Sequence, residues 1–187
     1  MSRGLVVASC SVTFGIFNDH PVNRLTEAGC TVRLNPYGRL MRPAEILEHA
    51  AGADVIILGN EVLDGSTIDK LSSLKLVVRH GSGLDNIDFT ACDARGIEVV
   101  NTPGANKEET ADLTFALILD LARKLTQSIN ELRAGVRNKI PGRSLYGKTI
   151  GIIGVGDIGM AVANRAMGFG MDILGNDIVQ REEAARY

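Results

Sequence analysis

Long apolar runs are missing from this sequence of 187 residues. No stretch approaches the ~20 consecutive apolar residues that a membrane-spanning helix needs, so we expect no contact with a membrane. The first apolar run, Leu5–Ala8, is also shorter than the ~7–15 residues of a signal-peptide core. We therefore interpret this run as a strand.

The sequence also has few cysteines and no excess of positive charge. The three cysteines, Cys10, Cys30 and Cys92, are odd in number and scattered, so neither a disulfide framework nor a metal-binding spacing follows. A reducing cytoplasm is the expected location. The formal net charge of -2 argues against a nucleic-acid partner.

The amino-acid composition, with 45% hydrophobic and 22% charged residues, is that of a globular protein. The chain length fits one or two domains. Short apolar runs alternate with amphipathic segments through the first hundred residues. Strands are predicted at Leu5–Ala8, Cys30–Leu34, Asp54–Leu58, Leu76–Arg79 and Ile97–Val100. Helices are predicted between them, at Val22–Ala28, from Pro43 to Gly52, at Asp64–Leu71 and at Thr90–Arg95. This alternation predicts an α/β fold, a parallel sheet with helices on both faces.

The run Asn101–Gly104 breaks the alternation and is the expected boundary between two domains, residues 1–101 and 102–187. A long helix follows over residues 106–124, with Asn106 and Glu109 as a predicted capping box. It is apolar on nearly every side, which is typical of a helix buried all round. We expect it to pack against the rest of the chain and a second subunit, giving a homodimer.

The segment Thr149–Met160 carries the pattern Gly154-x-Gly156-x-x-Gly159 between a strand and a helix, and a second strand then leads to Asp177. Gly154 permits a tight turn, Gly156 lets the backbone approach a pyrophosphate, and Gly159 allows close packing of helix on strand. The helix N-terminus attracts phosphate, and an acid at this spacing binds ribose hydroxyls. The pattern predicts a dinucleotide site; the alternative is a structural glycine turn.

A complete dinucleotide fold has two β-α-β-α-β halves. After Asp177 only residues 178–187 remain, which is too little for the second half. We therefore expect the chain to be the N-terminal part of a longer protein.

Three blocks of the sequence resemble the D-isomer-specific 2-hydroxyacid dehydrogenases, particularly the D-3-phosphoglycerate dehydrogenase-like members. The blocks are Val77–Asp88 with Arg95–Gly104, Glu109–Asp112, and Gly147–Gly159 continuing to Asp177. The resemblance implies a flavodoxin-like parallel-sheet domain that binds substrate, followed by the first part of a Rossmann domain that binds NAD. It implies hydride transfer between NAD and a D-2-hydroxy acid, with D-3-phosphoglycerate as one candidate.

The resemblance also implies site residues. The turn Gly81–Gly83 would hold the substrate carboxylate on its N–H groups, with Ser82 and Gly83 as substrate-binding residues. Without the resemblance, a plain strand-to-helix turn is the favoured interpretation. The residues implied to contact NAD are Ser82, Thr110, Gly154, Gly156, Asp157, Ile158, Gly159 and Asp177.

Three positions depart from the family pattern. Asp157 stands where the family often carries Arg or Lys beside the pyrophosphate. Gly59 falls roughly where the phosphoglycerate branch has an Arg that meets the substrate phosphate, which argues against that substrate. Asp112 replaces the commoner Glu.

The family's catalytic Arg, Glu and His come from the second half of the nucleotide domain, so they are expected beyond Tyr187 and no catalytic residue is assigned in this chain. His80 abuts Gly81 but does not match the catalytic position, and we interpret it as a packing or surface residue. No metal site is indicated. The alternative function is an NAD-sensing regulator of the co-repressor type that acts through dimerisation, because those relatives also open the long helix with the residues that stand here at Glu108–Asp112.

Overall fold

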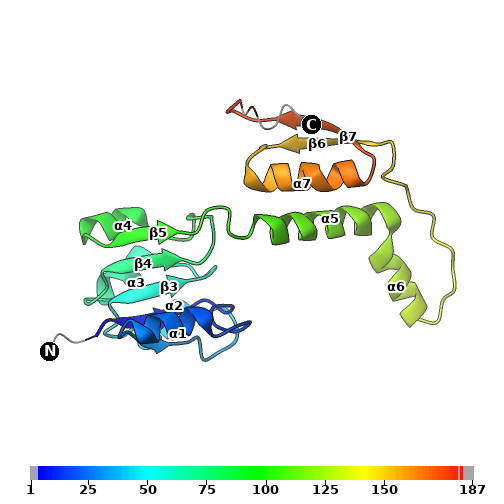
Figure 1. Cartoon of the computed structure of the whole chain (residues 1–187). Coiled ribbons are helices and arrows are strands. Elements are labelled where there is room, and N and C mark those ends of the chain that lie inside the picture. Colours follow the sequence, from blue (N-terminus) through cyan, green and yellow to red (C-terminus); the bar gives the residue numbers. More distant parts are fainter. Residues whose placement is uncertain (1–3, 181, 183–187) are drawn as a thin grey trace. The chain divides into compact units, whose positions relative to one another are not determined.

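The computed structural model describes residues 4–180 and 182 and divides into two compact units, residues 1–105 and 106–187 (Figure 1). The domain boundary expected from the sequence lies after Asn101.

The first unit is a parallel sheet with helices in the connections. Its strands are β1 (Val6–Ser9), β2 (Thr31–Arg33), β3 (Val55–Leu58), β4 (Leu76–Arg79) and β5 (Glu98–Asn101). Its helices are α1 (His20–Glu27), α2 (Pro43–His49), α3 (Gly65–Lys70) and α4 (Phe89–Ala94). The strands are all parallel in the order β2-β1-β3-β4-β5. This is the flavodoxin-like order, and it confirms the predicted α/β fold.

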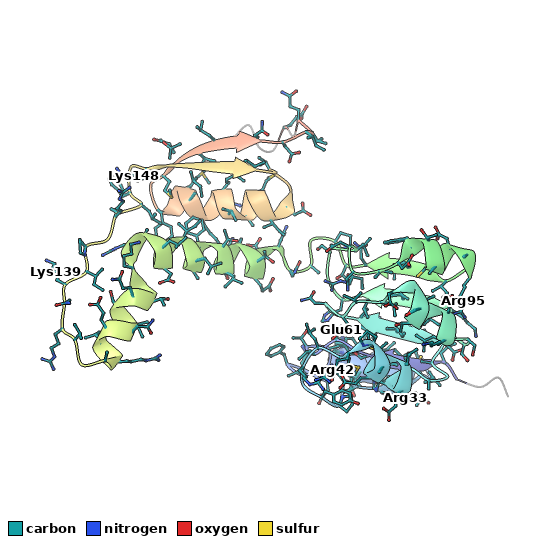
Figure 2. The ribbon with its side chains drawn as sticks, turned by 180° about the vertical axis from the view of Figure 1, so that it is seen from behind. Arg33, Arg42, Glu61, Arg95, Lys139 and Lys148 are labelled. Carbon is teal, nitrogen blue, oxygen red and sulfur yellow. The ribbon has the colours of Figure 1, made fainter. Side chains whose placement is uncertain are left out.

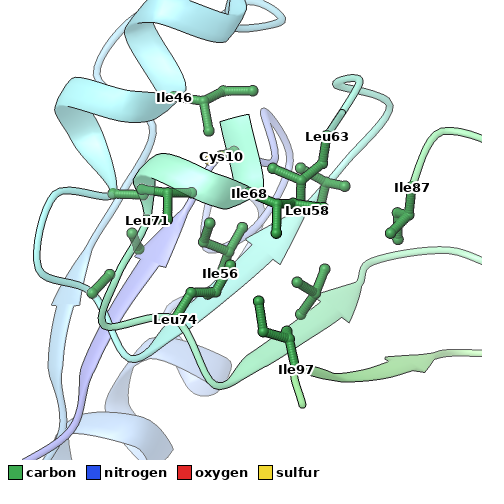
Figure 3. Close-up of a cluster of buried hydrophobic side chains, with 14 of the residues drawn as sticks. Cys10, Ile46, Ile56, Leu58, Leu63, Ile68, Leu71, Leu74, Ile87 and Ile97 are labelled. Carbon is green, nitrogen blue, oxygen red and sulfur yellow. The ribbon is translucent and has the colours of Figure 1, made fainter. Parts of the chain in front are cut away.

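The continuous apolar strand β3 explains how the sheet is covered on both faces. Because side chains alternate along a strand, Ile56 and Leu58 join one core cluster and Val55 and Ile57 join another. The larger cluster, shown in Figure 3, lies under α2, α3 and α4. The smaller cluster lies on the α1 side.

Local side chains set where the helices of this unit begin and how they are joined. Asp64 and Asp88 cap α3 and α4, each accepting a hydrogen bond from a backbone N–H three residues on (2.8 and 3.0 Å). The guanidinium of Arg95, labelled in Figure 2, donates to the carbonyls of Ile68 and Leu71. This arginine therefore ties the end of α4 to α3.

The second unit begins with two consecutive helices. Its elements are α5 (Lys107–Arg123), α6 (Leu125–Arg133), β6 (Thr149–Ile153), α7 (Asp157–Gly168) and β7 (Asp172–Asn176). Lys124, in the left-handed conformation at φ 58°, separates α5 from α6. Residues 134–148, between α6 and β6, form a mostly exposed loop that carries Lys139 and Lys148 (Figure 2). Strands β6 and β7 pair in parallel, and α7 connects them.

The core of the second unit lies between α5, α7 and the two strands. Phe115 of α5 packs with Ala161 and Val162 of α7. Arg165 of α7 then binds two acids of α5, with contacts of 2.5 Å to Asp112 and 3.0 Å to Glu108. One face of α5 is therefore fixed to α7.

Within this chain α7 covers only one face of α5, and Leu113, Leu117 and Leu121 of the open face are 61%, 56% and 72% exposed. Burial of that face against a second subunit stays a prediction. The capping box predicted for this helix is not formed. Asn106 is the N-cap residue but makes no side-chain capping hydrogen bond, since its backbone (φ -115°, ψ 21°) is not in the extended region that caps use.

Within residues 4–180 and 182, no helix is long and apolar enough to cross a membrane. The same residues contain no group of three His, Cys, Asp or Glu side chains that could hold a metal ion. All three cysteines are free thiols.

Candidate functional site

The glycine turn between β6 and α7 has a separate physical need for each glycine. Gly154 has φ +89°, a conformation that side chains disfavour, and its N–H donates to the Asn176 carbonyl at 2.7 Å. A Cβ on Gly159 would overlap the carbonyl oxygen of Gly154. These two glycines are required by the fold of the turn itself.

Gly156 differs from its neighbours because nothing in the fold requires it to be glycine. Its φ is -75°, and a Cβ placed there would meet no atom within 4 Å. It is the N-cap residue of α7, so the space beside it lies at the positive end of a twelve-residue helix. The missing side chain leaves room for a group that approaches the backbone closely, as a pyrophosphate does.

Asp177 follows β7 and reaches back to the glycine turn. Its Oδ2 accepts a hydrogen bond from the N–H of Val155 at 2.7 Å, and its Oδ1 accepts one from the N–H of Val179 at 3.1 Å. The structure thus brings Gly154, Gly156, Gly159 and Asp177 together at the carboxyl ends of β6 and β7.

The remaining residues implied to contact a cofactor in the second unit occupy the starts of its two main helices. Asp157 and Ile158 open α7 and are exposed. Thr110 lies in the first turn of α5, and its hydroxyl donates to the Asn106 carbonyl at 2.7 Å. That hydroxyl keeps its acceptor lone pairs.

The turn Gly81–Gly83 is anchored to the segment that follows β5. The N–H of Gly81 donates to Thr102 Oγ1 at 3.0 Å, and its carbonyl accepts from the N–H of Thr102 at 3.1 Å. The Ser82 carbonyl accepts from Asn101 Nδ2 at 2.8 Å. Gly83 is exposed, and no residue of the described chain accepts a hydrogen bond from its N–H. The turn is therefore held rigidly while Gly83 faces solvent.

The conformation of this turn depends on Arg79. Gly81 has φ +150°, and a Cβ there would lie 2.5 Å from Arg79 Nη1. Arg79 is 9% exposed, and its guanidinium donates to the His80 carbonyl (2.6 Å) and to Asn60 Oδ1 (2.7 Å). Glycine at position 81 is thus needed both for its backbone angle and for the space that the arginine fills.

The structure also joins polar residues that sequence reasoning did not connect. Ser11, after β1, hydrogen-bonds His80, after β4, with Oγ and Nδ1 2.9 Å apart. Glu61, after β3, is buried at 2% exposure and accepts from the N–H of Gly59 at 2.8 Å (Figure 2). The only signal in the sequence is that each residue follows a predicted strand, and carboxyl ends of parallel strands meet at one edge of a sheet.

Residues 12–182 match the family model described as D-isomer specific 2-hydroxyacid dehydrogenase, catalytic domain. The chain belongs to this family. The resemblance inferred from the three sequence blocks is thereby confirmed.

Individual members of the 2-hydroxyacid dehydrogenase family are similar over most of the chain. A D-3-phosphoglycerate dehydrogenase of Methanocaldococcus jannaschii is 42% identical over 145 residues, covering 75% of this chain and 28% of the relative. A glyoxylate reductase of Korarchaeum cryptofilum is 38% identical over 146 residues, covering 74% and 44%. The chain thus spans less than half the length of both relatives.

The solved structures give the same result for the fold. The NAD+-bound 3-phosphoglycerate dehydrogenase of Entamoeba histolytica superposes with a TM-score of 0.80 at 28% identity, covering 96% of this chain and 56% of that structure. The α/β architecture of this family member is therefore that of solved 2-hydroxyacid dehydrogenases.

Proposed function

We propose that the chain is part of an NAD-dependent oxidoreductase that transfers a hydride between NAD and the CH–OH group of a D-2-hydroxy acid. The observation that carries the proposal is the glycine turn closed by Asp177, in a chain of this family. We further propose that residues 1–101 bind substrate and that residues 102–187 begin the NAD-binding domain.

The residues of the glycine turn fit the adenosine and pyrophosphate half of NAD. The open space at Gly156 admits a pyrophosphate, and the N-terminus of α7 supplies N–H donors and a positive dipole. Asp177 would bind the ribose hydroxyls, and Asp157, Ile158 and Thr110 of the same unit are proposed as further contacts. The contact of Ser82, in the first unit, with NAD stays a prediction. NAD supplies the hydride acceptor. The NAD-bound state of the Entamoeba relative supports this assignment.

The acid Asp157 affects how strongly the pyrophosphate is held. It lies at the start of α7, where a carboxylate is favourable for the helix but repels a phosphate. The helix dipole and the backbone N–H groups therefore carry the attraction alone, and we expect modest affinity for NAD.

The substrate carboxylate is proposed to bind the turn Gly81–Gly83. Exposed backbone N–H groups such as that of Gly83 bind anions, and Ser82 adds a hydroxyl. D-3-phosphoglycerate stays a candidate because the Methanocaldococcus relative carries that name. Gly59 argues against it, because glycine supplies no cation for the substrate phosphate, and a Cβ there would already press on Glu61 Oε2 (2.8 Å) and the Ser11 Cα (3.2 Å).

The hydride step needs a cation that polarises the carbonyl and a His paired with a carboxylate that moves the hydroxyl proton. We expect the Arg, Glu and His in these roles to lie beyond Tyr187. The residues of this chain would bind and orient the cofactor and the substrate carboxylate.

We also propose a homodimer formed through the open face of α5. Leu113, Leu117 and Leu121 recur along that face and are exposed, and a row of large apolar side chains is typical of an interface. The cytoplasmic location expected from the cysteine pattern stays a prediction.

The test is NADH oxidation by the full-length protein with glyoxylate, pyruvate, hydroxypyruvate and 3-phosphohydroxypyruvate. We expect turnover of at least one acid. NAD binding without turnover of any acid would instead favour the alternative, an NAD-sensing regulator that acts through dimerisation.

A further inference from the structure

His80 spans the end of a strand to which it does not belong. It follows β4, and its Nδ1 lies 2.9 Å from the Oγ of Ser11, which follows β1. Because β3 lies between β1 and β4, the imidazole crosses the carboxyl end of β3. The Phe14 ring meets it edge-on, with ring centroids 6.0 Å apart. Two contacts from the segment after β1 therefore hold the ring in one orientation.

Gly59, at the end of β3, makes this crossing possible. A Cβ at Gly59 would approach the Ser11 Cα to 3.2 Å as well as the Glu61 carboxylate. A side chain at this position would therefore press on Ser11, whose hydroxyl holds His80.

The imidazole lies where open α/β sheets bind ligands. In the order β2-β1-β3-β4-β5, the chain leaves β1 toward β2 on one side and β3 lies on the other. Ligands of such sheets bind outside the carboxyl ends of the strands at this switch point. His80 also directly precedes the turn Gly81–Gly83 in the chain, so the residue joins the switch point to the proposed carboxylate site.

The second ring nitrogen of His80, Nε2, is the atom that can hydrogen-bond a ligand. The side chain is partly exposed, and no described residue hydrogen-bonds Nε2. Burial, with the nearby charge of Arg79, lowers the pKa of His80, so the ring is neutral near pH 7. In a neutral ring Nε2 either donates or accepts one hydrogen bond, depending on the tautomer that Ser11 selects.

We propose that His80, oriented by Ser11, is a specificity-determining residue that hydrogen-bonds a hydroxyl on the third carbon of a 2-oxo or 2-hydroxy acid. This inference rests on the proposed function, because the carboxylate of the same acid occupies the turn Gly81–Gly83. A hydroxyl both donates and accepts, so it satisfies either tautomer, whereas a methyl group satisfies neither. A phosphate in the same place would face a neutral ring, which supplies no charge to balance it.

The experiment is an NMR titration of the 187-residue chain with hydroxypyruvate and with pyruvate, followed at the backbone amides of residues 81–83. One neutral hydrogen bond corresponds to a preference of about two- to tenfold for hydroxypyruvate in dissociation constant. In His80→Phe, which keeps a ring against Phe14, we expect equal affinity for the two acids. His20→Phe, at an exposed histidine of α1, is the matched control and should keep the preference.

A second variant, Ser11→Ala, keeps the imidazole but removes the group that orients it. It should reduce the preference, and it tests the proposal even if His80→Phe does not fold. The role of His80 is overturned if folded His80→Phe keeps the preference for hydroxypyruvate, or if the unaltered chain binds both acids equally. Either result leaves the proposed carboxylate site standing. If neither acid shifts the amides of residues 81–83, the proposed carboxylate site is overturned as well.

Discussion

A carboxylate oxygen of Asp177 accepts a hydrogen bond of 2.7 Å from the backbone N–H of Val155, 22 residues earlier in the chain. The acid that would bind ribose is thus joined directly to the glycine turn that would bind pyrophosphate. A carboxylate has about four acceptor sites, so holding the turn leaves it able to accept from ribose hydroxyls. The two parts of the proposed cofactor site are therefore positioned by each other.

The charge of Asp177 leads to a prediction about cofactor choice. NAD should bind the chain at least about tenfold more tightly than NADP, because a carboxylate repels a 2′-phosphate. Asp177→Asn removes the charge and should narrow this difference. Isothermal titration with both cofactors measures it, and Asp172→Asn, which removes an exposed acid at the start of β7, is the control. Equal affinity of the unaltered chain for the two cofactors would contradict the assignment of Asp177.

Substitutions at two glycines of the turn should have different effects, one mainly on stability and the other mainly on NAD binding. Gly159→Ala places a methyl group against the Gly154 carbonyl and should destabilise the second unit by about 1–3 kcal/mol, an ordinary cost of overpacking. Gly156→Ala has open space around it, so its unfolding midpoint in urea should fall only by the smaller cost of alanine at an N-cap, about 0.5–1 kcal/mol.

The same Gly156→Ala methyl group occupies the path of the pyrophosphate, so NAD affinity should fall by at least about tenfold. Gly168→Ala is the control, because a Cβ there also meets no described atom within 4 Å. It should lower neither the unfolding midpoint nor the affinity for NAD. Full NAD affinity in Gly156→Ala would show that no pyrophosphate lies there.

The open face of α5 predicts self-association. Leu117→Glu and Leu121→Glu each place a charge among exposed apolar side chains, so a dimer held by this face should dissociate, because an unpaired charge is costly to bury. Sedimentation over a concentration series measures the change. Val62→Glu, a similarly exposed apolar residue of the first unit (58%), is the matched control. A dimer that persists in both leucine variants would place the interface elsewhere.

We expect the chain to lose stability in mild acid because of His49 and His80. Burial is the main cause that lowers the pKa of His80, with Arg79 second, and burial also lowers the pKa of His49, whose Nε2 lies 3.1 Å from the Ser9 carbonyl. The unfolded chain then binds protons more readily than the folded chain. The contribution of these two histidines to stability is fully present above the unfolded pKa of about 6.5. It is lost as the pH falls through their lower pKa values in the folded chain.

Thermal melts between pH 7.5 and pH 5 should therefore show a falling midpoint, and the fall should be smaller in His80→Phe. A midpoint that is independent of pH over this range would contradict both assignments.

Most of the fold could be predicted because its signals are local. Apolar runs such as Val55–Leu58 are long enough for a strand and too short for a helix, and glycine and aspartate mark the ends of the elements around them. The glycine spacing and Asp177 were recognised for the same reason, since one β-α-β unit contains all of them.

The environment of α5 could not be predicted from its composition. Leucines on every side of a helix predict burial, but they do not say whether the covering surface belongs to the same chain. In the structure α7 packs on Phe115 and leaves Leu121 exposed.

By itself, the sequence determined the alternation of strands and helices, the glycine turn and the family, because each depends on residues close together in the chain. Only the tertiary structure decided that Ser11 and His80, 69 residues apart, form a hydrogen bond across the end of β3. The order of strands in a sheet sets which strand ends are neighbours, and it depends on packing summed over the whole sheet, which no short pattern records.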